Sequence, residues 1–311
     1  MDLYNLKKNK LEEVDRVNFK LEKEIQTLVE ENVETLFNLE FISSEFSVSS
    51  FRLDSLCFDN ETNSFVVIEY KRGSSYSVID QGYSYMSTML NNKSDFILEY
   101  IEKTGKSLKK SDVDFSQSRI LFVSPSFNSY QKNSVNFKDV PFELWEIKKY
   151  SNGTIGLDQH MSTSEESIEM VEGNKNSVIK NVGKEVKVYT EDGCFENKEE
   201  SLRELYHQLK DKVSDWEGFN VDYHKTSCRF KNNKKIKIWI NVQKQCLHID
   251  LLSRIDFKGN VKSIKKKFTL DDPKKLFSLK KTNYHETYYY KLRNDKNIDY
   301  VVLMLKQKFD T

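Results

Sequence analysis

The segment Phe65-Val66-Val67-Ile68-Glu69-Tyr70-Lys71 decides the fold that we expect for this chain. Its continuous β-branched run is typical of a strand covered on both faces, so we place it at the centre of a sheet. Because side chains alternate along a strand, Glu69 and Lys71 point to one face and Tyr70 to the other. A carboxylate that ends such an apolar run is costly to bury without a partner, so the end of this strand is a candidate site.

A second strand precedes this one and forms a hairpin with it. The strand covers residues 51–59, and the turn Asn60-Glu61-Thr62-Asn63 joins it to the segment above. Asp54 lies on the first strand, 15 residues before Glu69. Pairing within the hairpin therefore predicts that the two carboxylates lie close together.

The rest of the first half alternates helices and strands around this hairpin. Apolar residues at helical spacing predict an amphipathic helix over residues 21–38 and two helices after the hairpin, over 78–90 and 94–104. Further strands are predicted at 40–48, 119–124 and 142–149, with a helix around 128–135. This order indicates an α/β fold, a mixed central sheet with helices on its faces.

The length of 311 residues allows two domains. The first is expected over residues 1–150, and the fading apolar periodicity of residues 151–195 predicts a linker. Residues 196–311 are expected to form a smaller α+β domain. Its predicted helices are 201–213 and 298–309, and its predicted strands are 227–231, 235–243, 246–252 and 286–292.

Charge divides between the two halves, although the net charge is only +1. Residues 1–195 hold 23 Lys and Arg against 32 Asp and Glu, whereas residues 196–311 hold 26 against 16. A basic half is typical of proteins that bind a polyanion, because each cation near a phosphate displaces condensed counterions. A solvated lysine-rich surface explains the same asymmetry equally well.

Several classes of protein are not expected from this sequence. No window approaches the roughly 20 apolar residues of a membrane span, so a cytoplasmic protein without a membrane partner is expected. The four cysteines form no C-x-x-C pair and the five histidines complete no zinc-ligand spacing, so reduced thiols without structural zinc are expected. No P-loop motif suggests nucleotide hydrolysis.

The residues at the strand ends fit a divalent metal site. Mg²⁺ or Mn²⁺ prefers oxygen ligands, which Asp54, Glu69 and the backbone carbonyl of Tyr70 can supply. Lys71 would orient the attacking oxygen or a phosphate beside the metal. Further candidates surround this set. They are Gln81 and Tyr85, spaced i, i+4 on the following helix, Glu24 at the border of the first helix's apolar stripe, and Glu45 in reserve on the preceding strand.

Residues 20–150 resemble the PD-(D/E)XK nuclease superfamily, in particular its NucS-like, Mrr-like and Holliday-resolvase-like members. The resemblance rests on three motifs in order, Arg52-Leu53-Asp54, Glu69-Tyr70-Lys71 and Gln81-x3-Tyr85. The small residue usual before the first motif is replaced by Phe51. The resemblance implies a restriction-endonuclease-like fold and an endonuclease that cleaves DNA with a divalent metal. It also implies that Asp54 and Glu69 are metal ligands and that Lys71 is the positioning cation. Supporting roles are implied for Glu24, Gln81 and Tyr85. Residues 196–311 resemble an uncharacterised carboxy-terminal domain found on such nuclease-like cores.

Other interpretations stay open at this stage. Asp54 paired with Arg52, and Glu69 with Lys71, would be ordinary ion pairs, and the whole chain could be an inactive nuclease fold that binds nucleic acid or regulates. Five residues are candidate contacts to nucleic acid, with Trp239 or residues 288–290 as stacking surfaces; they are Arg52, Lys235, Lys237, Lys265 and Lys266. A homodimer is plausible because cutting both strands needs two sites, and residues 196–311 could instead recruit the chain to a defence or repair complex.

Overall fold

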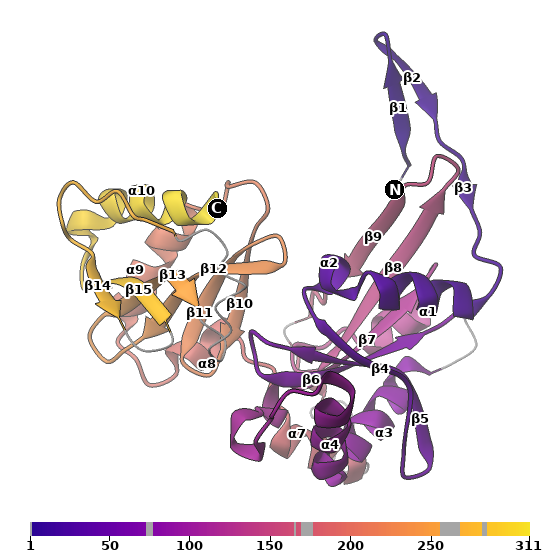
Figure 1. Cartoon of the computed structure of the whole chain (residues 1–311). Helices are drawn as coiled ribbons and strands as arrows, with labels where there is room; N and C mark the ends of the chain where they lie inside the picture. The colour runs from indigo at the N-terminus through magenta and orange to yellow at the C-terminus, as the bar shows by residue number, and fades with distance from the viewer. Residues whose placement is uncertain (1, 73–76, 165, 169–176, 256–267, 282–284) are drawn as a thin grey trace. The chain divides into compact units, whose positions relative to one another are not determined.

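The computed structural model describes residues 2–72, 77–164, 166–168, 177–255, 268–281 and 285–311 (Figure 1). The chain divides into two compact units, Met1–Val188 and Tyr189–Thr311. Each unit is built around its own sheet and its own buried cores. Among the described residues, no helix has the length and apolar character that crossing a bilayer demands.

The first unit is built on a seven-stranded mixed sheet. Its strands are β3 (Arg16–Val17), β4 (Glu40–Val48), β5 (Phe51–Asp59), β6 (Ser64–Tyr70), β7 (Arg119–Ser124), β8 (Phe142–Tyr150) and β9 (Ile155–His160). They lie in the order β3-β8-β7-β6-β5-β4, and β9 pairs with β8. The β6–β7 and β7–β8 pairs are parallel and the others antiparallel. All seven residues of β6 are buried, which confirms its predicted central position.

Helices cover both faces of this sheet, as predicted for a mixed α/β unit. One face carries α1 (Glu22–Glu31) and α2 (Val33–Phe37), whose apolar side chains pack with Val66 and Ile68. The other face carries α3 (Val78–Asn91), α4 (Lys93–Thr104), α5 (Ser129–Ser134) and α7 (Ser177–Glu185), packed around Val67. The single helix expected over residues 21–38 is interrupted at Asn32, whose backbone leaves the helical region at φ −127° and ψ 17°.

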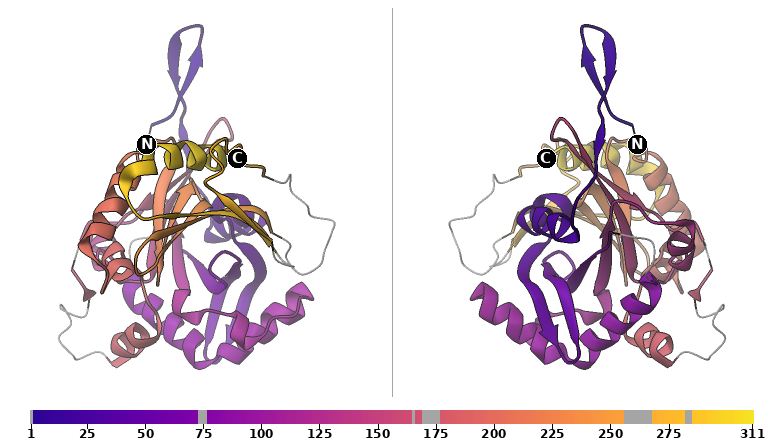
Figure 2. Two further views of the ribbon diagram at one scale, coloured as in Figure 1. Left: turned by 90° about the vertical axis from the view of Figure 1, so that its left-hand side faces the viewer. Right: turned by 90° about the vertical axis from the view of Figure 1, so that its right-hand side faces the viewer.

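A hairpin that the sequence did not indicate precedes the sheet. Strands β1 (Tyr4–Lys7) and β2 (Lys10–Glu13) form a separate two-stranded sheet that projects from the first unit (Figure 2). Nearly all of its side chains are exposed. Each strand has only four residues, so the alternation of Tyr4-Asn5-Leu6-Lys7 is too short to predict a strand from the sequence.

The described parts of residues 151–195, for which a linker was predicted, include elements that pack into the two units. Strand β9 extends the first sheet beside β8, and α7 packs against α3 with Ile179 and Val182 in the core. Helix α8 (Glu191–Phe195) already belongs to the second unit, where Cys194 and Phe195 are buried. These few apolar residues stand among polar ones, so only tertiary contacts show that they are buried.

The second unit has the expected α+β character. Its antiparallel strands are β10 (Phe219–His224), β11 (Ser227–Asn232), β12 (Lys235–Val242), β13 (Leu247–Ile255), β14 (Ser278–Lys281) and β15 (His285–Leu292), in the order β10-β11-β12-β13-β15-β14. Helices α8, α9 (Glu200–Asp211) and α10 (Ile298–Phe309) share one core with the sheet. The sequence did not predict β10 and β14.

Candidate metal and nuclease site

The β5–β6 hairpin brings Asp54 and Glu69 together. Ser55 pairs with Ile68, so the next positions outward, Asp54 and Glu69, face each other across the two strands. Asp54 Oδ2 accepts a hydrogen bond of 3.0 Å from the backbone N–H of Tyr70. The two carboxylates therefore lie at one end of the hairpin, as the sequence predicts.

The two carboxylate oxygens of Glu69 differ in their hydrogen bonding. Its side chain is only 6% exposed. Oε1 accepts from Lys71 Nζ at 2.7 Å and from Gln81 Nε2 at 2.6 Å. Oε2 is buried and has no hydrogen-bond partner among the described residues. An unpartnered buried carboxylate oxygen is unfavourable, so this atom points to a missing ligand.

Helix α3 supplies the side chains that hold Glu69. Gln81 Nε2 also donates to Tyr85 OH at 2.8 Å, so both predicted residues of this helix join the cluster. The helix begins at Ser77, whose hydroxyl accepts from Asp80 N at 3.3 Å. Gly82 lies against the sheet, where a Cβ would come within 2.7 Å of the Phe142 ring. The absence of a side chain at residue 82 thus lets the helix approach closely enough to reach Glu69.

The electrostatics of the site disfavour two negative charges. Burial, together with repulsion from Glu69, raises the pKa of Asp54 to about 7, although the Tyr70 N–H and Lys71 act in the opposite direction. Burial and the charge of Glu69 raise the pKa of Tyr85 above its usual value, so its hydroxyl stays neutral. The cluster lacks sufficient positive charge for two carboxylates.

These residues fit a divalent cation. Two carboxylates converge, and the orphaned Oε2 of Glu69 is an oxygen donor of the kind that Mg²⁺ and Mn²⁺ prefer. Among the described residues, no group of three or more His, Cys, Asp or Glu side chains is arranged to hold a metal. A site here would therefore rely on two carboxylates, the Tyr70 carbonyl and solvent.

Two predicted residues lie away from this cluster. Glu24 is not brought to it, because its carboxylate pairs with Lys149 Nζ at 2.8 Å and accepts from Lys20 N at 3.0 Å. These contacts hold its pKa below the usual value. Arg52 is exposed and pairs with Glu45 at 2.8 Å. The interpretation that Arg52 neutralises Asp54 is therefore not supported, whereas the Lys71–Glu69 ion pair does form.

A second polar network, which sequence reasoning missed, lies behind Asp54 on the α1 side. Gln26 Nε2 donates to the backbone oxygen of Asp54 at 3.1 Å and to Glu30 Oε1 at 2.9 Å. Ser55 Oγ donates to Glu30 at 2.6 Å and lies 3.0 Å from Tyr70 OH. Gln26 and Glu30 are spaced i, i+4 beside the apolar stripe of α1, and this spacing was the signal available in the sequence. The network fixes the backbone that carries Asp54.

The five predicted contacts to nucleic acid are only partly described. Arg52 is exposed and pairs with Glu45. Lys235 and Lys237 lie on β12. The pairing of β12 with β11 changes register between Phe230 and Lys231 of β11. Lys237 is half-buried, and burial and the charge of Lys235 lower its pKa. Lys265 and Lys266 lie outside the described residues. Their role as phosphate contacts stays a prediction.

Comparisons with known proteins identify one relative in sequence. The chain is 41% identical over 254 residues to an uncharacterised protein of Haemophilus influenzae, and the match covers 78% of this chain and 84% of that protein. No family model matches.

Two solved structures share a smaller part of the chain. A repair endonuclease from Pyrococcus abyssi is 20% identical, with a TM-score of 0.23, and the match covers 39% of this chain and 45% of that one. A complex of EndoMS with dsDNA is 21% identical, with a TM-score of 0.24, and the match covers 44% of this chain and 54% of that one. This chain thus spans about half the length of each structure.

Proposed function

This chain belongs to the same family as the uncharacterised Haemophilus influenzae protein, and we propose that it is a nuclease that hydrolyses phosphodiester bonds of DNA. We infer an endonuclease of the PD-(D/E)XK type with a restriction-endonuclease-like first unit. One observation carries it furthest: the buried, unpartnered Oε2 of Glu69 lies at a strand end that faces Asp54.

Asp54, Glu69 and the Tyr70 carbonyl would hold Mg²⁺ or Mn²⁺. The cation would supply Lewis-acid polarisation of a phosphodiester and neutralise charge that develops during hydrolysis. Glu69 is buried and Asp54 is half-buried, so water screens these carboxylates less and their attraction to a cation is stronger than at an exposed surface.

Lys71 and the α3 side chains complete the site. The ammonium of Lys71 lies 2.7 Å from Glu69 Oε1 and carries positive charge next to the place where a phosphate would bind. Its backbone N–H donates to Val123 O at 2.9 Å, which fixes the residue beside the sheet. Gln81 holds Glu69 in one orientation and is itself bonded to Tyr85. We assign Lys71 to orienting the attacking oxygen or the phosphate, and Gln81 and Tyr85 to positioning Glu69.

A plasmid-cutting assay tests this function. Supercoiled, linear and branched DNA are incubated with the full chain, with Mn²⁺ and with EDTA. Metal-dependent nicking or linearisation that is lost in Asp54→Ala, Glu69→Ala and Lys71→Ala is the expected result. Full cutting by all three folded variants would contradict the assignment.

A matched carboxylate control sharpens the assay. Glu24 lies on α1 and is paired with Lys149, away from the cluster, so Glu24→Gln is expected to cut like the unmodified chain. DNA binding that is equal with EDTA and with Mg²⁺, without any cutting, would instead identify a binding protein that has kept the fold.

A further inference from the structure

The second unit has a sheet face that carries no helix of that unit among the described residues. Alternate residues of β12 and β13, including Ile238, Ile240 and Ile249, face the core shared with α8, α9 and α10. The residues between them, such as Trp239 and Asn241, project to the other side. We call that side the open face.

The open face is hollowed. A cavity of about 600 Å³ is lined by residues of four neighbouring strands, a volume within the roughly 300–1,000 Å³ typical of ligand sites. Its lining consists of Trp239, Asn241, Gln243, His248, Asp250, Leu252, Lys280, Thr287, Tyr289 and Lys291. All belong to the second unit, so the hollow is a feature of that unit alone.

Strand register arranges the lining in rows. Trp239 pairs with Asp250, and Asp250 pairs with Tyr289, so one row runs from aromatic ring to carboxylate to aromatic ring. Since neighbouring strands lie about 4.8 Å apart, the two aromatic residues stand roughly 10 Å from each other across β13. Residues 241, 248 and 291 form the next row, which ends in the exposed Lys291. Lys280, also exposed, pairs with Thr287 on the far side of the first row.

The chemistry of these rows suits nucleobases and phosphates. Half-buried Trp239 and Tyr289 offer ring faces on which bases stack. Exposed Lys280 and Lys291 are complementary in charge to a phosphate backbone. Asp250 is the one acid of the lining; its carboxylate accepts from Asn241 Nδ2 at 2.9 Å and lies 3.5 Å from His248 Nε2. A carboxylate held in this way can accept a hydrogen bond from a base amino group.

We propose that the open face binds single-stranded nucleic acid, with bases stacked on Trp239 and Tyr289 and phosphates held by Lys280 and Lys291. Bases of a duplex are stacked on one another and paired, so their faces are not available to the rings of Trp239 and Tyr289. The inference goes beyond the proposed nuclease site and does not require that the chain cuts DNA.

Fluorescence anisotropy tests this proposal. The full chain carrying Glu69→Gln, chosen to prevent cleavage, is titrated against a labelled 20-nucleotide thymidine oligomer, a 20-base-pair duplex and poly-glutamate. Binding of the single strand is expected to be at least tenfold tighter than that of the duplex, and to weaken as salt rises. Equal binding of strand and duplex, or of strand and poly-glutamate, overturns the proposal.

Variants separate stacking from charge. Added to the same background, Trp239→Ala and Tyr289→Ala should each weaken binding by about 5- to 100-fold, the range for loss of one stacked base. Trp239→Phe keeps a ring and should bind within about threefold, which separates stacking from a loss of folding. The exposed double change Lys280→Glu with Lys291→Glu should weaken binding at least tenfold.

Matched surface variants provide the controls. Tyr130→Ala removes an aromatic side chain that is 70% exposed on the first unit, and Lys296→Glu reverses an exposed lysine just before α10. Neither should change binding by more than twofold. Unchanged binding in both Trp239→Ala and the double lysine variant overturns the inference. A wild-type chain that binds the oligomer but never cuts DNA would instead contradict only the nuclease function.

Discussion

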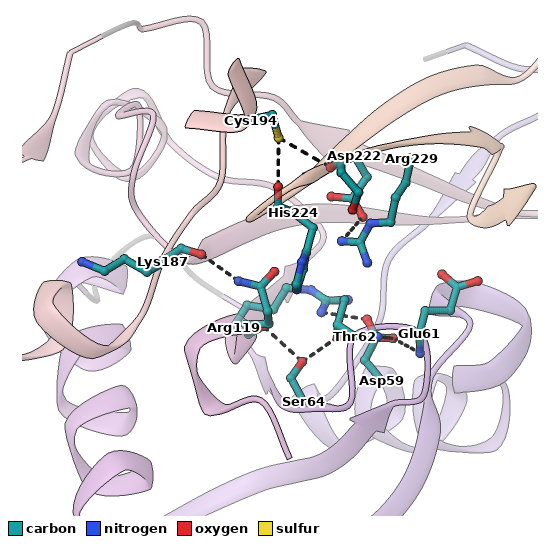
Figure 3. Close-up of polar contacts among 12 residues, drawn as sticks. Asp59, Glu61, Thr62, Ser64, Arg119, Lys187, Cys194, Asp222, His224 and Arg229 are labelled. Carbon is teal, nitrogen blue, oxygen red and sulfur yellow. Dashed lines mark hydrogen bonds and ion pairs between the residues drawn. The ribbon is translucent and has the colours of Figure 1, made fainter. Parts of the chain in front are cut away.

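The β5–β6 hairpin carries a largely buried aspartate near each end, and the two have opposite surroundings. Near the turn, Asp59 accepts from Glu61 N at 2.8 Å and Thr62 N at 3.1 Å, and it pairs with Arg119 at 2.9 Å (Figure 3). Burial alone would raise the pKa of Asp59, but Arg119 and the two N–H groups hold it below its usual value. Its charge is neutralised within the protein.

Among the described residues, no arginine forms an ion pair with Asp54 near the open end; Arg52 on the same strand pairs with Glu45 instead. Burial, together with repulsion from the neighbouring carboxylate of Glu69, raises the pKa of Asp54 to about 7. Lys71 pairs with Glu69, yet one oxygen of Glu69 remains without a hydrogen-bond partner among the described residues. The comparison teaches that burial alone does not identify a functional acid. An acid neutralised by its own fold stabilises the structure, whereas a pair with too little positive charge is suited to bind a cation.

The largest expected difference between the two aspartates concerns cutting. Asp54→Asn should slow DNA cleavage by about 1,000-fold, because a ligand of the cation is lost. Asp59→Asn should cut within about threefold of the unmodified chain per folded molecule. Initial rates of plasmid nicking, corrected for the folded fraction measured by circular dichroism, check this. An equal loss of cleavage rate in Asp54→Asn and Asp59→Asn would contradict different roles for the two aspartates.

The free energy of unfolding should respond in the opposite order, with the larger effect at the Asp59 site. Arg119→Met leaves Asp59 buried without its cation and is expected to lower the free energy of unfolding by about 2 kcal/mol, less than for a fully buried pair because Arg119 is 24% exposed. Asp54→Asn should not destabilise the protein at pH 7. Urea unfolding of the two variants measures this. A neutral effect of Arg119→Met would show that the ion pair is not what accommodates Asp59.

The pH dependence of stability should differ in sign. The pKa of Asp54 is raised, so the folded state holds its proton more tightly, and its contribution to stability is lost as pH rises from 3.8 toward about 7. Asp54→Asn removes this loss and should raise the free energy of unfolding by on the order of 1 kcal/mol at pH 8 without metal. The pKa of Asp59 is lowered, so the contribution of Asp59 is present above pH 3.8 and is lost as pH falls. Urea unfolding measured at a series of pH values from about 2 to 8 distinguishes the two aspartates.

Much of the first unit could be predicted from sequence. Strands β4 and β5 have the predicted bounds, because a half-buried hairpin imposes a clear apolar pattern. Strict alternation placed Glu69 and Lys71 on one side and Tyr70 on the other, and the structure confirms this. Helical spacing likewise brought Gln81 and Tyr85 together.

The missed parts have different physical causes. Helix α7 is held by contacts with α3, which lies far away in sequence. Strand β9 pairs with the preceding strand β8, but its side chains are half-buried or exposed throughout, so no clear apolar alternation marks it. For α1, the rotation of the helix decided which polar residue points toward the hairpin. Glu24 turned toward Lys149 and Gln26 toward Asp54, a choice that local pattern does not determine.

Binding of Mn²⁺ tests the central claim most directly. Isothermal titration calorimetry of the full chain should detect binding in the unmodified protein, binding of similar affinity in Asp59→Asn, and an affinity at least 100-fold weaker in Asp54→Asn and Glu69→Gln. The same affinity in all four folded proteins, or no binding to the unmodified chain, would contradict the claim that residues 54 and 69 share a cation.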